Sequence, residues 1–205
     1  MKVINYGHSC IEISGSISVI FDQYQDGSVP GLKLPLITSN YAFKTHDHFD
    51  HNADYRVLKT ECNIKPDITE IIVPHDKNNG KDRGFNKIFT LNIDGYRIAH
   101  MGDIGCVPSH ETLKSLDKCD ILFAPINGFF TISAQELKQI VDMIHPRIVV
   151  PMHYYNKENN TGYPDGGQID IFKKLFPDYL EVNKSFDVDD KLFNNKVIIF
   201  KNAAQ

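Results

Sequence analysis

Three histidines and two aspartates lie within six residues, directly after a β-rich run, in the stretch Thr45-His46-Asp47-His48-Phe49-Asp50-His51. Alternate side chains of an extended segment point the same way, so His46 and His48 can converge on one ion. Asp50 and His51 follow where the chain turns, and they can reach a second ion. Imidazole and carboxylate ligands together suit zinc-like divalent cations, whereas calcium sites are built from oxygen atoms. The alternative interpretation is a solvated loop that happens to be rich in histidine.

Three more candidate ligands follow along the chain, each in a local setting that suits a functional side chain. His75 comes after the β-rich run Ile68 to Val73 and Pro74, Asp103 lies in a Gly-Asp pair, and His153 ends the apolar run Ile148 to Met152. Taken alone, a histidine at the end of a strand is ordinarily a hydrogen-bonded structural residue. Their order along the chain, after the cluster, favours a shared metal site.

This ordered set resembles the metallo-β-lactamase superfamily, which carries His-x-His-x-Asp-His after an early strand, then a single His, a Gly-Asp pair and a late His. The resemblance implies an α+β fold, a four-layer αββα sandwich with the site at one edge of two sheets. It implies two divalent metal ions, with zinc expected and manganese or iron as alternatives. The first ion would be held by His46, His48 and His75, the second by Asp50, His51 and His153, and Asp103 would bridge them. Asp50 would also be catalytic, orienting the water nucleophile.

The similarity is greater to a small hydrolase branch of the superfamily that includes sugar-lactone hydrolases. The matching segments are Gly7-His8-Ser9, Phe21-Asp22, Arg83-Gly84-Phe85-Asn86, Asp94 to Gly105 and Pro151 to Tyr154. We therefore expect a binuclear hydrolase that activates a bridging water to cleave a small polar ester, lactone or phosphodiester. A di-metal redox protein and a non-catalytic metal-binding or regulatory module of the same fold are the alternatives. The short interval between His51 and His75 argues against hydrolysis of penicillins.

Composition limits the partners that we expect. The net charge is −4 and no basic block occurs, so neither nucleic acid nor an anionic membrane is an expected partner. The sequence contains no signal-peptide pattern and no apolar run of about 20 residues, which predicts a cytoplasmic protein. Four scattered cysteines fit free thiols in a reducing compartment. At this length we expect one domain over residues 1–205, a small-molecule substrate and, as an open question, a homo-oligomer.

Short β segments are predicted in the first third of the chain, and alternating strands and helices in its later half. Asp94-Gly95 predicts a type I′ hairpin between Ile88–Ile93 and Tyr96–Ala99. A capping box at Ser133 begins a predicted helix that Pro146 ends. The other predicted strands are Val3 to Tyr6, Ile11 to Ile13, Ile17 to Phe21, Tyr41 to Lys44 and Ile121 to Ala124, with a helix at Leu113 and Leu116 and one long irregular segment, Tyr154 to Gly167, a candidate lid or subunit contact.

For several polar residues two roles stay open. His8 could contact substrate, donate a proton or be structural, and Asp22 could orient metal ligands or simply end a strand. Arg83 could hold an anionic group such as phosphate or be solvated. His100 is expected to support the site from behind, whereas His110 and His145 are expected at helix ends, and the ligand set is complete without Cys106.

Overall fold

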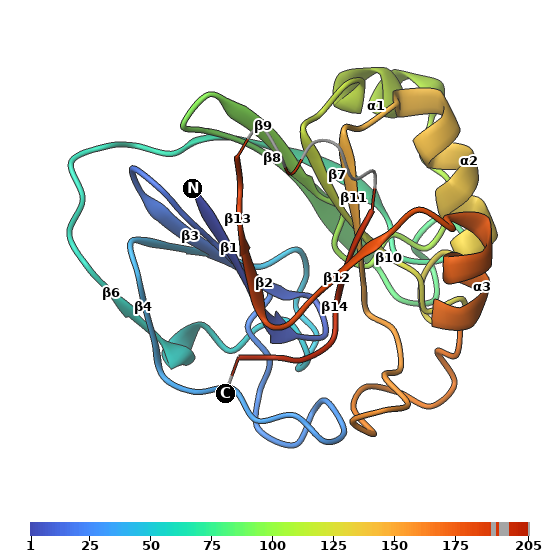
Figure 1. Ribbon diagram of the computed structural model, residues 1–205, viewed down its shortest axis with the longest axis horizontal. Coiled ribbons are helices and arrows are strands. Elements are labelled where there is room, and N and C mark those ends of the chain that lie inside the picture. The colour runs from blue at the N-terminus through green and yellow to red at the C-terminus, as the bar shows by residue number, and fades with distance from the viewer. Residues whose placement is uncertain (190–191, 193–196, 205) are drawn as a thin grey trace.

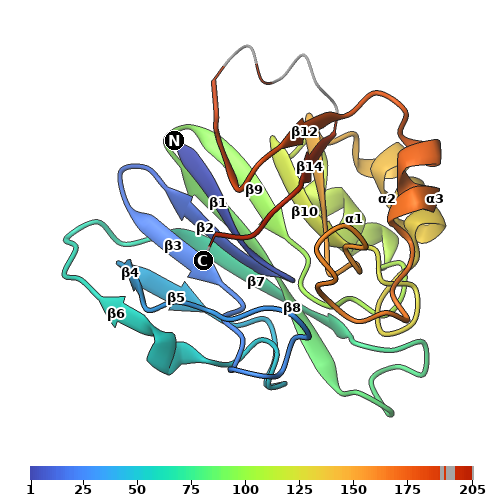
Figure 2. The same ribbon diagram turned by 60° about the horizontal axis from the view of Figure 1, so that its bottom comes forward.

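Two β-sheets face each other across a hydrophobic core (Figures 1 and 2). The computed structural model describes residues 1–189, 192 and 197–204. Within these residues the first sheet has five strands, in the order β13 (Ser185–Asp187), β1 (Lys2–Gly7), β2 (Cys10–Ser14), β3 (Ser18–Phe21) and β5 (Tyr41–Phe43). The first four strands are antiparallel to one another in this order, and β5 runs parallel to β3.

The second sheet has the order β11 (Ile148–Met152), β10 (Ile121–Pro125), β9 (Tyr96–His100), β8 (Phe85–Ile93) and β7 (Asp67–Pro74). The strands β9, β10 and β11 are parallel, whereas β8 is antiparallel to both of its neighbours. Asp94 and Gly95 join β8 to β9 with φ angles of 52° and 83°, which confirms the predicted type I′ turn.

Helices cover the outer face of the second sheet (Figure 1). They are α1 (His110–Leu116), α2 (Ala134–Ile144) and α3 (Ile169–Leu175). The capping box of α2 is confirmed, because the Ser133 hydroxyl accepts from the Glu136 N–H and the Glu136 carboxylate accepts from the Ser133 N–H. The apolar stripe Leu137, Ile140 and Ile144 is buried against the sheet, and His145 ends the helix in the left-handed conformation.

In the described part of the chain, the layer outside the first sheet consists of irregular segments and short strands instead of α-helices. The irregular stretch 24–36, the 3₁₀ turn η1 (Asp54–Arg56) and the strand pair β4 (Ile37–Ser39) and β6 (Val57–Lys59) pack there around Tyr24 and Leu34. The α+β sandwich is thus confirmed, and within the described residues its outer layer on this side contains no α-helix. The prediction of one long irregular segment was wrong, since residues 24–36 form a second.

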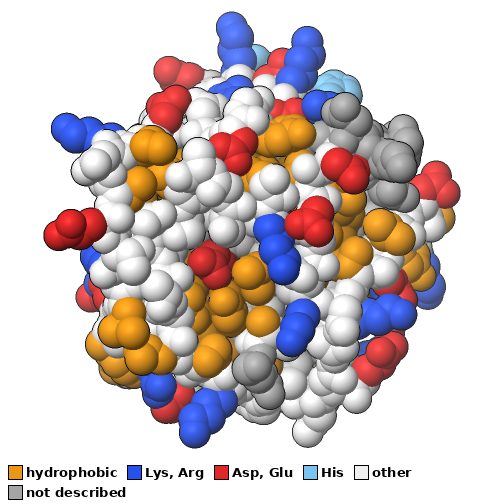
Figure 3. Space-filling model, turned by 60° about the vertical axis from the view of Figure 1, so that its left-hand side comes forward, with side chains coloured by type: hydrophobic (Ala, Val, Ile, Leu, Met, Phe, Trp, Pro, Cys, Tyr) orange, Lys and Arg blue, Asp and Glu red, His pale blue; other side chains and the backbone are white. Residues whose placement is uncertain are grey.

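Four features lay outside the predictions: α3, the strand β13, the β4 and β6 pair, and a second parallel pair, β12 (Leu180–Val182) with β14 (Ile198–Phe200). On the face shown in Figure 3, acidic and basic side chains are interspersed with apolar ones. Among the described residues, no helix combines the length and apolar character that a membrane crossing requires.

The strand directions bring several chain segments to one edge of the sandwich. Because β3 and β5 are parallel and Phe21 pairs with Phe43, the residues that follow both strands emerge together. In the second sheet β7, β9 and β11 run in the same direction, so their carboxyl ends also share an edge. The two sheets meet at this edge, where the His153 N–H donates to the carbonyl of His8 in the β1–β2 turn. Open α/β sheets commonly bind ligands at such strand ends.

Candidate metal centre

The structure brings together all seven of the predicted ligands, although they come from four separate parts of the chain. His46 to His51 follow β5, His75 follows β7, Asp103 follows β9 and His153 follows β11. Their side chains fall into three overlapping groups whose potential ligand atoms lie within 4.8 Å of one another in each group. These groups are His46, His48 and His75; His46, His51 and Asp103; and His8, Asp50, His51 and His153.

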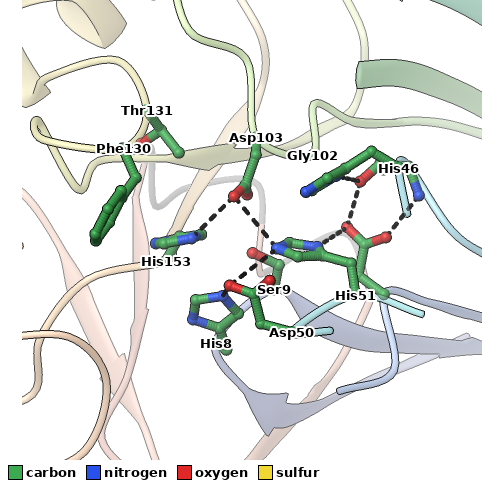
Figure 4. A network of polar contacts seen from close by, with 12 residues as sticks. His8, Ser9, His46, Asp50, His51, Gly102, Asp103, Phe130, Thr131 and His153 are labelled. Carbon is green, nitrogen blue, oxygen red and sulfur yellow. Dashed lines mark hydrogen bonds and ion pairs between the residues drawn. The ribbon is translucent and has the colours of Figure 1, made fainter. Parts of the chain in front are cut away.

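Asp103 lies between the first and third groups (Figure 4). Its Oδ2 is 2.9 Å from His153 Nε2, 3.2 Å from His51 Nε2 and 3.8 Å from His75 Nε2. One carboxylate therefore faces histidines of both groups. This is the position that a bridging ligand would need.

His8 belongs to the third group and was not among the predicted ligands. Its side chain is only 1% exposed, its Nε2 lies 3.3 Å from Asp50 Oδ2, and its ring centroid lies 3.8 Å from that of His153. The Tyr163 hydroxyl also lies within hydrogen-bond distance of Asp50 Oδ2, at 3.1 Å, and of the Ser28 carbonyl, at 2.6 Å. Asp50 Oδ2 is thus held between two neighbours, which restricts the orientation of this carboxylate.

Asp22 supports the site from behind, one of the two roles left open by the sequence. Its fully buried carboxylate accepts hydrogen bonds from the N–H and the hydroxyl of Thr45, at 2.7 and 2.9 Å, and lies 3.0 Å from His51 Nδ1. The Thr45 hydroxyl donates to Asp22, so its oxygen is free to accept from His46 Nδ1, 3.0 Å away. One buried carboxylate therefore orients His51 directly and His46 through Thr45, and both histidines keep Nε2 available.

Asp103 is positioned by its own set of neighbours. The Asn86 side chain accepts from the Asp103 N–H at 2.8 Å and donates to the Met101 carbonyl at 2.8 Å. Gly102 has φ +54°, and a Cβ there would lie 2.2 Å from Asn86 Oδ1, so only glycine fits this turn. His100 lies behind it, with Nε2 3.0 Å from the Ser9 carbonyl and Nδ1 accepting from the Gly102 N–H at 3.3 Å.

The electrostatics of the cluster favour the protonation state that a metal ligand requires at His46 and Asp103, but the opposite state at His51. Burial, with the charge of a protonated His51 second, lowers the pKa of His46 to about 3. Burial by itself would raise the pKa of Asp103, but His153 and His51 hold it well below its usual range. Burial also opposes a charged His51, yet Asp103 and Asp22 raise its pKa well above the usual value. A metal ion here would replace the His51 proton between the two carboxylates.

Several buried ligand atoms have no hydrogen-bond partner in the part of the chain that the structure describes. They are His46 Nε2, both ring nitrogens of His75, Asp103 Oδ1 and His153 Nδ1. Buried polar atoms are normally satisfied, because leaving one unpaired costs about 1–3 kcal/mol. Their convergence, and their chemistry of imidazole and carboxylate, fit divalent metal ions. Cys106 is half-buried and belongs to none of the ligand groups found among the described residues.

A pocket of about 470 Å³ opens onto these residues. Five of the predicted ligands line it: His48, Asp50, His75, Asp103 and His153. Its remaining lining consists of Ser28, Asp47, Phe49, Arg83, Phe130 and Tyr163. A second cavity, of about 550 Å³, shares His153 with it but is otherwise lined by residues of the terminal segments, the 31–32 turn and the stretch after β11. We place the chemistry in the smaller pocket, because most of the candidate ligands face it.

Sequence reasoning missed Thr45, Asp76, Phe130 and Tyr163. Thr45 adjoins the histidine motif, and Asp76 adjoins His75, so their proximity in sequence was an available signal. Tyr163 lies 113 residues from its partner Asp50 in the sequence, so no local sequence pattern could predict their contact. His110 lies at the start of α1 and His145 at the end of α2, as predicted.

The chain was compared with known proteins. The family model described as "Beta-lactamase superfamily domain" matches residues 2–153. A protein named "UPF0173 metal-dependent hydrolase" from Thermococcus onnurineus is 29% identical over an alignment of 217 residues. This alignment covers 89% of this chain and 95% of the relative. A relative of the same name from Natranaerobius thermophilus is 26% identical over 185 residues, covering 75% and 83% of the two chains.

Solved structures agree with the fold. A metallo-beta-lactamase superfamily protein from Thermotoga maritima superposes with a TM-score of 0.74 at 23% identity, covering 97% of both chains. The isothiocyanate hydrolase from Delia radicum gut bacteria superposes with a TM-score of 0.61 at 13% identity, covering 97% of this chain and 96% of the other. With the matched residues spanning both sheets except β13, and including all seven predicted ligands, this chain belongs to the beta-lactamase superfamily.

Proposed function

We propose that this protein is a binuclear metal-dependent hydrolase that cleaves a small polar ester, lactone or phosphodiester. One observation carries the proposal: seven potential ligands from distant parts of the chain converge, and several of their buried atoms have no partner among the described residues. The names of the relatives, metal-dependent hydrolases, support the same class of reaction.

The residues divide into two ligand sets. His46, His48 and His75 would hold one ion, Asp50, His51 and His153 the other, and Asp103 would face both. Zinc is the metal that we propose, since this mixture of imidazole and carboxylate is typical of it, with manganese and iron as alternatives. When bound, two such cations lower the pKa of water toward neutrality and polarise a carbonyl or phosphoryl oxygen.

The side chains have separate tasks in this scheme. Asp50, fixed by contacts to His8 and Tyr163, would orient the attacking water through its carboxylate. Asp22 and Thr45 would hold His51 and His46 in the tautomers that leave Nε2 free. Phe49 and Phe130 would exclude water from one side of a substrate seated in the pocket. The pocket volume suits a small molecule.

The test combines metal content with turnover. After reconstitution with zinc or manganese, we expect close to two ions per chain by elemental analysis, and hydrolysis of at least one compound in a panel of esters, lactones, thioesters and phosphodiesters. Asp50→Asn should lose turnover while keeping a native circular dichroism spectrum. His110→Asn is the matched control, because His110 is exposed at the start of α1, away from the ligand groups. A folded protein that binds less than one ion per chain would refute the proposal.

A further inference from the structure

Arg83 is the only lysine or arginine among the described residues that line the metal pocket. The other charged side chains in the lining are carboxylates. Asp50 and Asp103 belong to the candidate ligand groups, and exposed Asp47 is paired with Lys44 at 2.9 Å. Arg83 therefore contributes the one fixed positive charge of the pocket wall that metal ligation would not use.

The guanidinium of Arg83 is held by an aromatic ring rather than by an acid. Its Cζ lies 4.5 Å from the centroid of the Phe130 ring, a typical cation–π distance. Among the described residues, the Phe130 ring is the contact found for the guanidinium of Arg83. No carboxylate of the described residues lies within ion-pair distance of this guanidinium. A cation–π contact does not use up the hydrogen-bond donors of the guanidinium, and no acceptor for them is found in the part of the chain that the structure describes.

The backbone of Arg83 is fixed by Asp76, which follows the candidate ligand His75. The Asp76 carboxylate accepts four backbone N–H groups of the same loop, those of Asn78, Gly80, Asp82 and Arg83, at 2.7, 2.9, 3.0 and 2.8 Å. The loop is closed by a further hydrogen bond, from the His75 N–H to the Gly84 carbonyl at 3.0 Å. Arg83 is thus preorganised on a short rigid loop tied to a metal ligand, which lowers the entropy that binding would cost.

From this arrangement we propose that Arg83 binds an anionic group, a carboxylate or phosphate, on the substrate, away from the bond that is cleaved. Apolar atoms between the two ends of the substrate would pack against Phe49 and Phe130, which line the same pocket. The geometry selects small esters, lactones or phosphodiesters that carry a further anionic group over those that lack one. The choice of cleaved bond rests on the proposed function, whereas recognition of the anion does not.

The first test measures binding without turnover. Phenyl phosphate and phenylacetate are titrated calorimetrically into the zinc-loaded protein and into its Arg83→Gln variant. We expect the affinity for at least one of these anions to fall roughly 10-fold in the variant, the usual loss for a charge-assisted hydrogen bond. The difference should shrink at high salt, because Arg83 is exposed and its field is screened. If the variant loses affinity for only one of the two anions, that anion shows whether Arg83 recognises a phosphate or a carboxylate.

The controls separate this role from general effects of charge. Lys81→Gln removes the same charge from an exposed side chain of the same loop that does not line the pocket, and it should leave both affinities unchanged. Arg83→Lys should restore part of the affinity, and Phe130→Leu should weaken it by releasing the guanidinium. Because the Arg83 N–H to Asp76 is kept in every variant at position 83, folding should be preserved. Equal affinities of wild type and Arg83→Gln for both anions would overturn the inference.

The second test uses a matched substrate pair, mono-p-nitrophenyl glutarate and neutral p-nitrophenyl valerate. Arg83→Gln should lower kcat/KM for the glutarate ester about 10-fold, mostly through KM, and leave the valerate ester unchanged. If the wild type hydrolyses neither ester, that result counts against these ester substrates and leaves the binding result standing. If both esters are hydrolysed and the variant affects them equally, anion recognition by Arg83 is wrong while the hydrolase proposal survives.

Discussion

Asp22→Asn should weaken metal binding at both halves of the centre while leaving every potential ligand in place. The aspartate is fully buried, and three groups lie within 3.0 Å of its carboxylate oxygens: the N–H and hydroxyl of Thr45 and Nδ1 of His51. An asparagine offers one oxygen and one NH₂ group. If the oxygen faces the Thr45 hydroxyl and His51, the NH₂ group points at the Thr45 N–H, and a donor meets a donor.

The size of the effect follows from that mismatch. One buried donor left unpaired costs about 1–3 kcal/mol, and the neighbour of a metal-bound histidine typically changes metal affinity by about 10–100-fold. For a chain of this length, each kcal/mol lowers the Tm by about 2–4 °C. We therefore expect the metal-free variant to melt about 2–12 °C lower than the wild type, and each zinc affinity to fall at least about 10-fold.

The assay is a competition titration of zinc against a chromophoric chelator, with thermal melts of the metal-free protein alongside. Thr45→Val is the matched variant, since it removes the hydroxyl that links Asp22 to His46 and leaves the Asp22–His51 contact in place. It should weaken one binding step, whereas Asp22→Asn weakens both. Wild-type zinc affinities in Asp22→Asn, or equal losses at both steps in Thr45→Val, would refute the reasoning.

Three further perturbations test other parts of the site. Zinc affinity should rise with pH through and above the ordinary histidine pKa, because His51, whose pKa is raised by two carboxylates, must lose its proton to bind metal; a flat profile in buffered titrations would contradict this. Gly102→Ala should cost at least about 1 kcal/mol of unfolding free energy and lower metal content, because its φ is positive and its Cβ would strike Asn86, as a denaturant titration and elemental analysis can check. Tyr163→Phe should keep the fold but lower kcat about 10-fold by loosening Asp50, and an unchanged kcat would argue against that contact.

The parts of the fold that could be predicted are those with a local cause. The Asp94-Gly95 turn needs positive φ at two positions, and the capping box of α2 satisfies its own backbone, so both are visible within a few residues. The helix α3 was missed because its preceding residue, Gln168, makes no side-chain cap and its seven residues give a weak periodic signal. The pair β12 and β14 depends on a partner strand far along the chain, and each strand has only three residues.

The residues of the candidate site likewise divide into those that the sequence could predict and those that it could not. The motif His46 to His51 could be interpreted from spacing alone, and the order of His75, Asp103 and His153 from resemblance to a family. Their convergence is now visible, whereas their roles as ligands stay predictions. His8 and Tyr163 could not be placed, because their contacts to Asp50 depend on how the β1–β2 turn and the segment after β11 fold back over the site.

The loop organised by Asp76 has a consequence for how such a site could change. Its shape comes from one carboxylate and four main-chain N–H groups, so the identity of most intervening side chains is irrelevant to it. The exposed Lys81, for example, can therefore be exchanged without disturbing His75. Preference for one compound over another could drift by substitution at this loop while the hydrolytic apparatus stays intact.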